Sequence, residues 1–288
     1  MKNTPPEFCA FILTHGRPNK IHTLKSLRNQ GYTGKVYFIV DDEDETLEEY
    51  KKKYGDDVIV FNKLKISQTF DEADNFNKDR RAIVYARNFC FEAAKNLGIK
   101  YFIQLDDDYT HFRYTLDRNG DYTTKFVKNL DKAFSIFIEY YKKIPALSIA
   151  FAQGGDLIGG GASNTLRSGR VKRKAMNTFF CSTDRPFQFS GRINEDVNTY
   201  TALGMQGNIF MTLTNICITQ VQTQANKGGM TELYLDSGTY IKSFYTIIFC
   251  PSAVKIYTMG ETKKRIHHKI KWENCAPCIL RQELKKTA

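Results

Sequence analysis

Short apolar runs alternate with longer amphipathic stretches through the first 110 residues of the chain. The apolar runs have the length of buried strands, and each ends at polar or turn-forming residues: 8–13, 36–40, 58–61 and 101–105. Three intervening stretches place apolar side chains at helical spacing: 19–29, 47–54 and 83–97. Strands that alternate with helices predict a parallel sheet with right-handed crossovers, so we expect an α/β fold.

The rest of the chain is less regular. Its helical and strand-like patterns cover three segments: 126–141, 147–152 and 194–203. The glycine-rich segment 154–161 lacks the lysine of a phosphate-binding P-loop and opens no clear helix. Because no repeat or linker divides the sequence, we expect residues 1–288 to form a single domain. Its two halves are expected to cover 8–110 and 111–288.

Three consecutive aspartates follow the fourth apolar run. Side chains alternate along a strand, so Asp106 and Asp108 are expected on the same side of the backbone. Two carboxylates held this close repel each other unless a cation lies between them, and Mg²⁺ or Mn²⁺ prefers such oxygen ligands. A solvated acidic turn is the alternative interpretation, and the triplet alone does not decide between the two.

Polar residues also follow the first two apolar runs. Arg17 follows the first run, and Asp41 and Asp42 follow the second. The carboxyl ends of parallel strands meet at one edge of a sheet, and ligands bind beyond that edge. The convergence of these residues with the aspartate triplet therefore favours a ligand site over a chance acidic turn.

The charge balance adds a candidate partner. The chain has 42 Lys and Arg residues against 31 Asp and Glu residues, which gives a formal net charge of +11. Such an excess favours a polyanionic partner, either nucleic acid or an anionic membrane surface. Basic residues gather over 167–174 and 263–271, although a solvated surface is the alternative interpretation of each cluster.

The cellular setting is predicted from what the sequence lacks. No apolar run approaches the roughly 18 residues of a membrane span, and the first residues lack the apolar stretch of a signal peptide. The seven scattered cysteines argue against a disulfide framework. We therefore expect a soluble, cytoplasmic protein without a membrane partner.

Five motifs, in order along the chain, resemble nucleotide-sugar glycosyltransferases of the GT-A fold. Ala86-Arg87-Asn88 before Asp106-Asp107-Asp108 resembles the family's Ala-Arg-Asn triplet and Asp-x-Asp signature. Segments 14–18 and 41–44 look like its first two strand ends, 194–197 like its catalytic-base segment and 265–268 like its C-terminal histidine segment. The resemblance implies a Rossmann-type, mostly parallel sheet flanked by helices. The first half would bind the nucleotide sugar and the less regular C-terminal half the acceptor.

A narrower resemblance is to the TET-associated glycosyltransferases, many of them from phages, which glycosylate hydroxymethylated cytosine in DNA. It rests on His15-Gly16-Arg17-Pro18, the triple aspartate, Asn194-Glu195-Asp196-Val197 and the segment 265–272. It implies a metal-dependent transferase that moves a sugar from a nucleoside diphosphate sugar, a UDP-sugar in our prediction, to 5-hydroxymethylcytosine in DNA. A phage enzyme of this kind would act in the cytoplasm of a bacterial host.

The resemblance implies a metal site and a catalytic base. Asp108 is expected to be the main ligand of Mn²⁺ or Mg²⁺, with Asp106 nearby. His267 or His268 is expected to complete the ligand shell, and a basic surface stretch is the alternative for both histidines. The general base is expected in the pair Asp196 and Glu195, with Asp196 first and Glu195 orienting it or exchanging roles. A helix N-terminus that favours acids is the alternative there, and both can hold together.

The resemblance also implies contacts with the donor. They are expected from ten residues of the first half: Thr14, Arg17, Asp41, Asp42, Arg81, Arg87, Asn88, Gln104, Asp106 and Asp107. Guanidinium groups match phosphate geometry, so Arg17, Arg87 and either Arg80 or Arg81 are candidates for the diphosphate. Pairing with nearby acids is the alternative for these arginines.

Other functions stay open at this point. Phe179, Phe180, Phe187 and Phe189 are candidates for a pocket that receives a flipped base, although a buried core is the favoured interpretation. The transferase could act on a polysaccharide, glycolipid or protein. Asp106, Asp108 and Asp196 could instead form a two-metal nuclease or nucleotidyltransferase site, and a DNA-binding protein without catalysis is a further alternative.

Overall fold

The computed structural model describes residues 7–73, 78–117, 119–157, 160–162, 175–221, 240–260, 264–277 and 282. Its main sheet contains eight strands: β1 (Phe8–Leu13), β2 (Val36–Asp41), β3 (Val58–Phe61), β4 (Tyr101–Asp106), β5 (Tyr109–Tyr114), β6 (Ala146–Gln153), β7 (Phe179–Ser182) and β8 (Ile209–Gln220). A separate hairpin consists of β9 (Val254–Met259) and β10 (Arg265–Ile270). The α-helices are α1 (His22–Asn29), α2 (Leu47–Tyr54), α3 (Lys63–Ser67), α4 (Val84–Asn96), α5 (Leu130–Lys142), α7 (Glu195–Met205), α9 (Ile241–Phe249) and α10 (Trp272–Cys275).

The main sheet is mostly parallel, as the sequence predicts. Its strand order is β3-β2-β1-β4-β7-β6-β8-β5. The first four strands pair in parallel, and β6 also pairs in parallel with β8. Only β7 and β5 run against the other strands of this sheet as the structure describes it. The predicted α/β class with a mostly parallel sheet is therefore confirmed.

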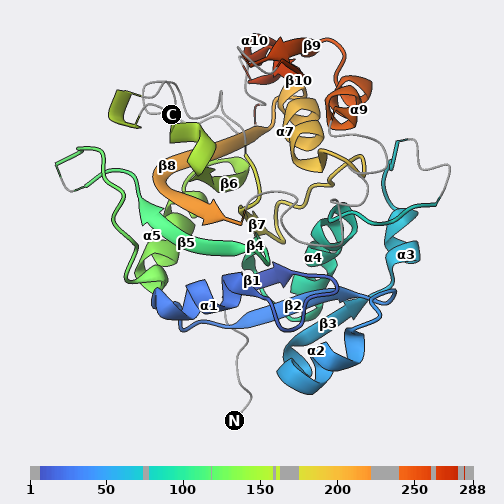
Figure 1. Ribbon diagram of the computed structural model, residues 1–288, viewed down its shortest axis with the longest axis vertical. Helices are drawn as coiled ribbons and strands as arrows, with labels where there is room; N and C mark the ends of the chain where they lie inside the picture. The colour runs from blue at the N-terminus through green and yellow to red at the C-terminus, as the bar shows by residue number, and fades with distance from the viewer. Residues whose placement is uncertain are drawn as a thin grey trace.

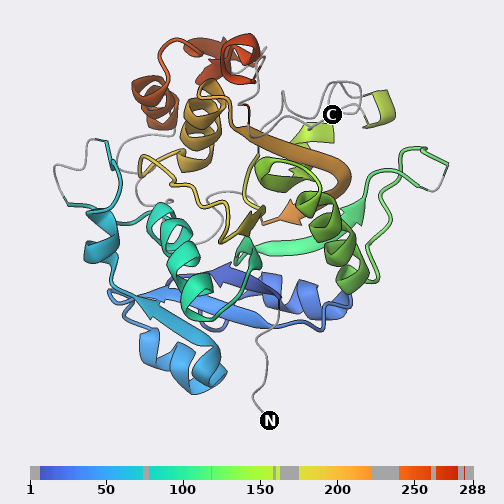
Figure 2. The same ribbon diagram turned by 180° about the vertical axis from the view of Figure 1, so that it is seen from behind.

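Helices cover both faces of the sheet, because its central strands are apolar on both sides (Figures 1 and 2). In β1, Ala10 and Ile12 face a core formed with α1, α2 and α5. Cys9 and Phe11 face a second core, formed with α4 and α7. The alternation of side chains along a strand thus divides one apolar run between two cores.

The start of α5 differs from the sequence prediction. The apolar pattern begins at Phe126, but the helix begins at Leu130. Asn129 caps it, since its side-chain oxygen accepts a hydrogen bond of 2.8 Å from the backbone N–H of Lys132. Phe126 instead forms a backbone bridge with Arg113 of β5. The cap, rather than the apolar period, therefore determines where the helix begins.

The C-terminal elements pack against α7. Figure 1 shows α9, α10 and the β9–β10 hairpin gathered next to α7 at one end of the molecule. Tyr200 of α7 stacks on Trp272 of α10 with ring centroids 5.8 Å apart. A Cβ at Gly204 would lie 2.0 Å from the carbonyl oxygen of Cys275, so this close approach requires glycine. Within the described residues, no helix is long and apolar enough to cross a membrane.

Candidate functional site

Four parallel strands end at the same edge of the sheet, where the predicted site residues lie. Leu13 at the end of β1 pairs with Ile39 of β2 on one side and with Asp106 of β4 on the other. Asp41 at the end of β2 pairs with Phe61 of β3. The chain leaves β1 toward β2 and β3 and returns on its other side at β4. This reversal at β1 is a topological switch point, the usual ligand site of such sheets.

Asp107 ties the loop after β1 to the loop after β4. The hydroxyl of Thr14 donates a hydrogen bond of 2.8 Å to its Oδ2, and Arg17 Nη1 donates one of 2.9 Å to its Oδ1. Thr14 is also 2.8 Å from the hydroxyl of Tyr50 in α2. Burial raises the pKa of Asp107, while Arg17 and Thr14 oppose that shift. The structure therefore brings these three predicted donor residues together, with Asp107 already held by the other two.

Arg87 joins β4, the strand that ends in the aspartate triplet, to the predicted catalytic pair. Its side chain is only 1% exposed, and it donates 2.9 Å hydrogen bonds from Nη2 to Asp106 and from Nε to Glu195. The guanidinium also lies 5.2 Å from the ring centroid of Phe179 and 5.8 Å from that of Phe189. One buried cation thus pairs with an acid from β4 and an acid from α7. Pairing with nearby acids was the alternative interpretation of this arginine.

Asp108 lies in a different environment from its two neighbours. Its Oδ1 is buried and has no hydrogen-bond partner among the described residues. Burial, followed by the charges of Asp106 and Asp107, raises the pKa of Asp108 to about 7. Burial also raises the pKa of Asp106 to about 6, although Arg87 opposes that shift. A buried carboxylate oxygen without a donor, beside two more carboxylates, fits a Mg²⁺ or Mn²⁺ ion because those ions take oxygen ligands.

The two predicted histidine ligands lie on β10. His267 pairs with Tyr257 of β9 and His268 with Ile256, and His267 Nδ1 is 2.7 Å from the carbonyl oxygen of His268. No group of three or more His, Cys, Asp or Glu side chains is arranged for a metal in the part of the chain that the structure describes. The structure therefore does not bring His267 and His268 into a ready-made shell with the aspartates, and their metal role stays a prediction.

The acids after β2 already have protein partners. Asp41 is 2.7 Å from His15 Nδ1 through Oδ2 and 2.7 Å from Lys63 Nζ through Oδ1. Burial alone would raise the pKa of Asp41, but its hydrogen bonds with His15 and Lys63 lower it below the usual value. Asp42 accepts hydrogen bonds of 2.5 Å from Asn62 Nδ2 and 2.9 Å from the N–H of Lys63. These contacts add His15 and Lys63 to the site edge. His15 belongs to the motif at 14–18, but the sequence singled out neither residue as a site residue.

A strand-end rule could have found His15 and Lys63. His15 follows β1 by two residues, and Lys63 follows β3 by two. The hydrogen bond to Asp41 is the main cause that raises the pKa of His15, and the ring remains 45% exposed. Lys63 is buried, which is rare for an unpaired lysine, so its ion pair with Asp41 is the reason for its position. Both side chains place a basic group at this edge of the sheet, next to Asp41.

Two predicted donor residues have structural contacts. The side chain of Asn88 forms two hydrogen bonds with the backbone of Phe189. It accepts one of 2.8 Å from the N–H and donates one of 3.0 Å to the carbonyl oxygen. Gln104 is fully buried, and its amide donates to the carbonyl oxygen of Arg87 at 3.1 Å. Both side chains therefore fix the position of α4 and Arg87, and direct contact with the donor stays a prediction for them.

The other candidate arginines also face acids. Arg81 donates to Asp79 from Nε at 3.0 Å and from Nη2 at 2.9 Å. Arg80 Nη1 lies 3.9 Å from a carboxylate oxygen of Glu43. Both arginines therefore lie next to acids, which is the alternative interpretation given for them. Their contact with a diphosphate stays a prediction.

The predicted catalytic pair begins α7. Glu195 and Asp196 are both buried in the first helical turn, and Asp196 Oδ1 accepts a 2.8 Å hydrogen bond from the N–H of Val197. Asn194 before them has a left-handed backbone with φ of 61°. A helix N-terminus stabilises negative charge, so it favours both acids irrespective of catalysis. Glu195 reaches the site through Arg87.

The phenylalanines over 179–189 belong to the core. Phe179, Phe180 and Phe189 are buried, and Phe187 packs against the core that contains Phe179 and Phe189. The favoured core interpretation is therefore confirmed for them. The basic cluster over 167–174 lies outside the described residues.

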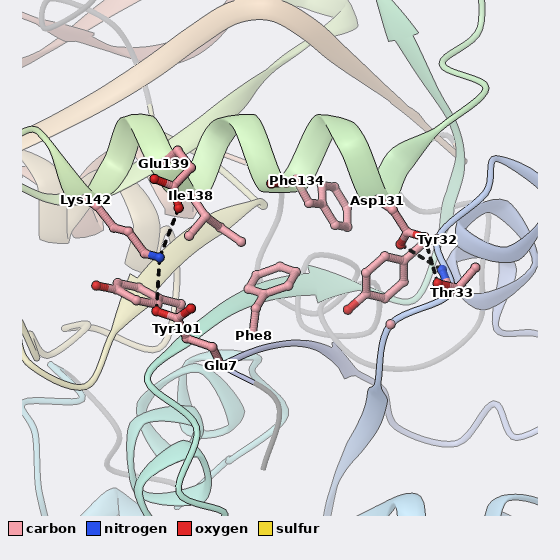
Figure 3. Close-up of a pocket in the computed structure, with 12 residues that line it drawn as sticks. Glu7, Phe8, Tyr32, Thr33, Tyr101, Asp131, Phe134, Ile138, Glu139 and Lys142 are labelled. Carbon is pink, nitrogen blue, oxygen red and sulfur yellow. Dashed lines mark hydrogen bonds and ion pairs between the residues drawn. The ribbon is translucent and has the colours of Figure 1, made fainter. Parts of the chain in front are cut away.

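A cavity of about 280 Å³ lies at the opposite edge of the sheet (Figure 3). Glu7 and Tyr101, at the amino ends of β1 and β4, line it together with residues of α5. Lys142 bridges Glu7 and Glu139 at 3.0 and 3.1 Å. These charges pair with one another, and the cavity is separate from the carboxyl edge. The site of interest is therefore the carboxyl edge of β1, β2 and β4.

Several solved structures are similar to the chain in fold. Glucosyl-3-phosphoglycerate synthase from Mycobacterium tuberculosis, in complex with Mg²⁺ and UDP, aligns with a TM-score of 0.46 and 8% identity, over 91% of this chain and 87% of that one. A mannosyltransferase from Pyrobaculum calidifontis, in complex with GDP-mannose and Mn²⁺, aligns with a TM-score of 0.46 and 11% identity, over 86% and 73%. TarS of S. aureus aligns with a TM-score of 0.42 and 13% identity, over 82% of this chain but 39% of that one.

Sequence comparison supplies the family. No curated protein matches the chain. The family model of the TET-Associated Glycosyltransferases (TAGT) matches residues 8–229, which is more than half of the 288 residues. The match spans the aspartate triplet, Arg87 and the Glu195–Asp196 pair, and it confirms the narrower resemblance seen in the motifs. The chain therefore belongs to the TET-Associated Glycosyltransferase family and is a glycosyltransferase.

Proposed function

We propose that this enzyme transfers a sugar from a nucleoside diphosphate sugar, a UDP-sugar, to the hydroxymethyl group of 5-hydroxymethylcytosine in DNA. The observation that carries the proposal is the buried Asp108 Oδ1, which has no partner among the described residues and lies at the switch point of the sheet. The family description and the net charge of +11 support a DNA acceptor. We further propose that the protein is phage-encoded and acts in the bacterial cytoplasm.

Asp108 and Asp106 would hold the divalent cation. When bound there, Mn²⁺ or Mg²⁺ neutralises the charge that develops on the diphosphate leaving group. Arg17 lies at the same edge and is attached to Asp107, and its Nε is buried without a hydrogen-bond partner in the described part of the chain. We assign this guanidinium to the donor diphosphate, since its geometry matches phosphate oxygens.

Asp196 is the residue that we assign to accept the proton from the acceptor hydroxyl. Glu195 already accepts from Arg87, so its carboxylate is held in an ion pair. Asp196 adjoins it in the same helical turn, where the helix N-terminus favours negative charge and a carboxylate can serve as a general base. Glu195 and Arg87 then act as positioning residues that fix α7 against β4.

A base inside a duplex cannot reach such an edge without leaving the stack. A DNA acceptor therefore requires the modified cytosine to be flipped out. Basic residues would supply the phosphate contacts, so affinity should fall as salt rises.

A nucleoside digest analysed by mass spectrometry tests the proposal. Hydroxymethylcytosine DNA and plain cytosine DNA are incubated with the protein, Mn²⁺ and a panel of nucleotide sugars. A sugar mass added only to hydroxymethylcytosine is expected. Release of nucleoside diphosphate without a DNA adduct would refute the DNA acceptor and leave a polysaccharide or protein acceptor. Cut or extended DNA without donor consumption would instead establish a nuclease or nucleotidyltransferase.

A further inference from the structure

Two exposed rings stack on each other on β5 and the segment that follows it. The ring centroids of His111 and Phe126 are 4.5 Å apart, and the planes differ by 14°. Phe126 is 54% exposed, and His111 is also exposed. Tyr114 and Tyr122, 38% and 40% exposed, lie on the same two arms of the chain. Aromatic rings are usually buried, so this exposed set suits a binding partner that has aromatic rings of its own to stack on them.

The backbone beneath the rings is well supported. The N–H of Val127 donates to the carbonyl of Phe112 at 3.0 Å, and the N–H of Tyr114 donates to the carbonyl of Lys125 at 2.9 Å. Phe112 is fully buried and anchors β5 in the main core. The rings therefore stand on a preformed hairpin, and little conformational entropy is lost when a partner binds. Figure 1 shows this hairpin projecting beyond β5 at the side of the molecule.

The stacked pair lies on the strand that follows the aspartate triplet and on the segment paired with it. β5 begins one residue after Asp108, and His111 is three residues beyond Asp108 along the chain. Three residues of extended strand cover about 10 Å. That distance equals about three stacked base steps of DNA. A DNA strand whose modified nucleotide lies at the carboxyl edge of the sheet therefore has bases one to three steps away within reach of the rings.

The charges around the rings suit a nucleic acid. Lys125 and Lys128 flank Phe126, and both are exposed. The two acids between residues 109 and 128 are Asp117 and Asp121, beyond the rings toward the tip. Asp117 is turned into that tip, where it accepts from the N–H groups of Asn119 and Asp121 at 2.9 and 3.0 Å. Aromatic faces with flanking lysines are the usual arrangement for binding unstacked bases and their phosphates.

We propose that His111 and Phe126 form a stacking platform for a DNA base within about three steps of the nucleotide under modification, with Lys125 and Lys128 on the phosphates. The proposal rests on the proposed function, because it assumes a DNA acceptor. The platform offers a new stacking partner to the DNA strand where extrusion of the target base has broken the original stack.

The test measures DNA binding and transfer separately. Wild-type protein, Phe126→Ala, His111→Ala and Phe126→Trp are titrated against a fluorescent duplex that contains one hydroxymethylcytosine. Ile136→Ala is the matched control, because Ile136 is 56% exposed but lies on α5. Loss of one stacking ring is expected to weaken DNA binding by roughly 5- to 150-fold. Phe126→Trp and the control should bind like the wild type, while the slow hydrolysis of donor without DNA stays unchanged in all variants.

Three outcomes would overturn the platform. They are unchanged DNA affinity in both alanine variants, loss of donor hydrolysis together with DNA affinity, and a change of molecular mass in light scattering. The last would identify a contact between proteins. If wild-type protein modifies hydroxymethylcytosine but the alanine variants bind normally, only the platform fails. If wild-type protein neither binds nor modifies this DNA, the proposed function fails.

Discussion

Replacing Arg87 by methionine should destabilise the protein strongly, because one buried cation holds two acids. Asp106 and Glu195 each lie 2.9 Å from its guanidinium, with side chains only 22% and 11% exposed. Removing one partner of a buried pair costs about 3–5 kcal/mol, since it leaves an uncompensated buried charge. Some water reaches both acids, so we expect a value near 3 kcal/mol. That corresponds to a fall of roughly 5 °C in the melting temperature of a chain of this length.

Urea unfolding at neutral pH, followed by circular dichroism, measures this loss directly. Lys100→Met is the matched control, because Lys100 and Asp184 form an ion pair at 2.8 Å with both side chains about half exposed. The urea concentration at the unfolding midpoint of Lys100→Met should equal that of the wild type. Glu195→Gln in the Arg87→Met background removes one of the two stranded charges, so the double variant should recover part of the lost stability.

The reasoning about Arg87 fails under two results. One is a loss of stability in Arg87→Met no larger than that of the Lys100 control. The other is strict additivity of Arg87→Met and Glu195→Gln, which would mean that the two side chains are not energetically coupled. Either result would remove the physical reason for treating Asp106, Arg87 and Glu195 as one unit.

Three further predictions concern the chemistry and the pH response. Asp108→Asn should lower kcat by about 100- to 1,000-fold with an unchanged melting temperature, and transfer that still saturates normally with Mn²⁺ would contradict its metal role. Asp196→Asn should slow transfer by about 100- to 10,000-fold while the donor KM stays constant, and a rise in KM alone would argue against a proton acceptor. His15 has a raised pKa in the folded state because of Asp41, so its contribution to stability is complete below about pH 6.5 and is lost as pH rises through the folded pKa. Urea unfolding between pH 5 and 9 should show this slope in the wild type and a flatter profile in His15→Gln.

The strand and helix pattern of the first half could be predicted from the sequence because each element carries its own signal. The segments 47–54 and 58–61 coincide with α2 and β3 residue for residue. Burial of both sheet faces makes these strands continuous apolar runs, and helical spacing marks the segments between them. The strand ends then place the aspartate triplet at the carboxyl edge of the sheet, but the strand order that makes this edge a switch point comes from the structure.

The role of Arg87 could not be predicted in the same way. A guanidinium fits phosphate and carboxylate equally well, and the deciding partner, Glu195, is 108 residues away. β5 was missed for a related reason. It pairs with β8, for example His111 with Thr219, and that pairing is also about 100 residues distant in sequence. Sequence patterns report local preference, whereas these residues take their roles from contacts between distant segments.

The three aspartates of the triplet share one motif but have three different environments. Asp106 is paired with Arg87, Asp107 with Arg17, and Asp108 with no side chain that the structure describes. The fold therefore pairs two of the three carboxylates with arginines and leaves Asp108, with Asp106 beside it, as the proposed place for a cation. Because the described residues offer no group of three protein ligands, a cation held by Asp108 and Asp106 would take further ligands from water and the donor diphosphate. Metal and donor should then bind tightly only together, so that the chain completes its catalytic centre only when the nucleotide sugar is present.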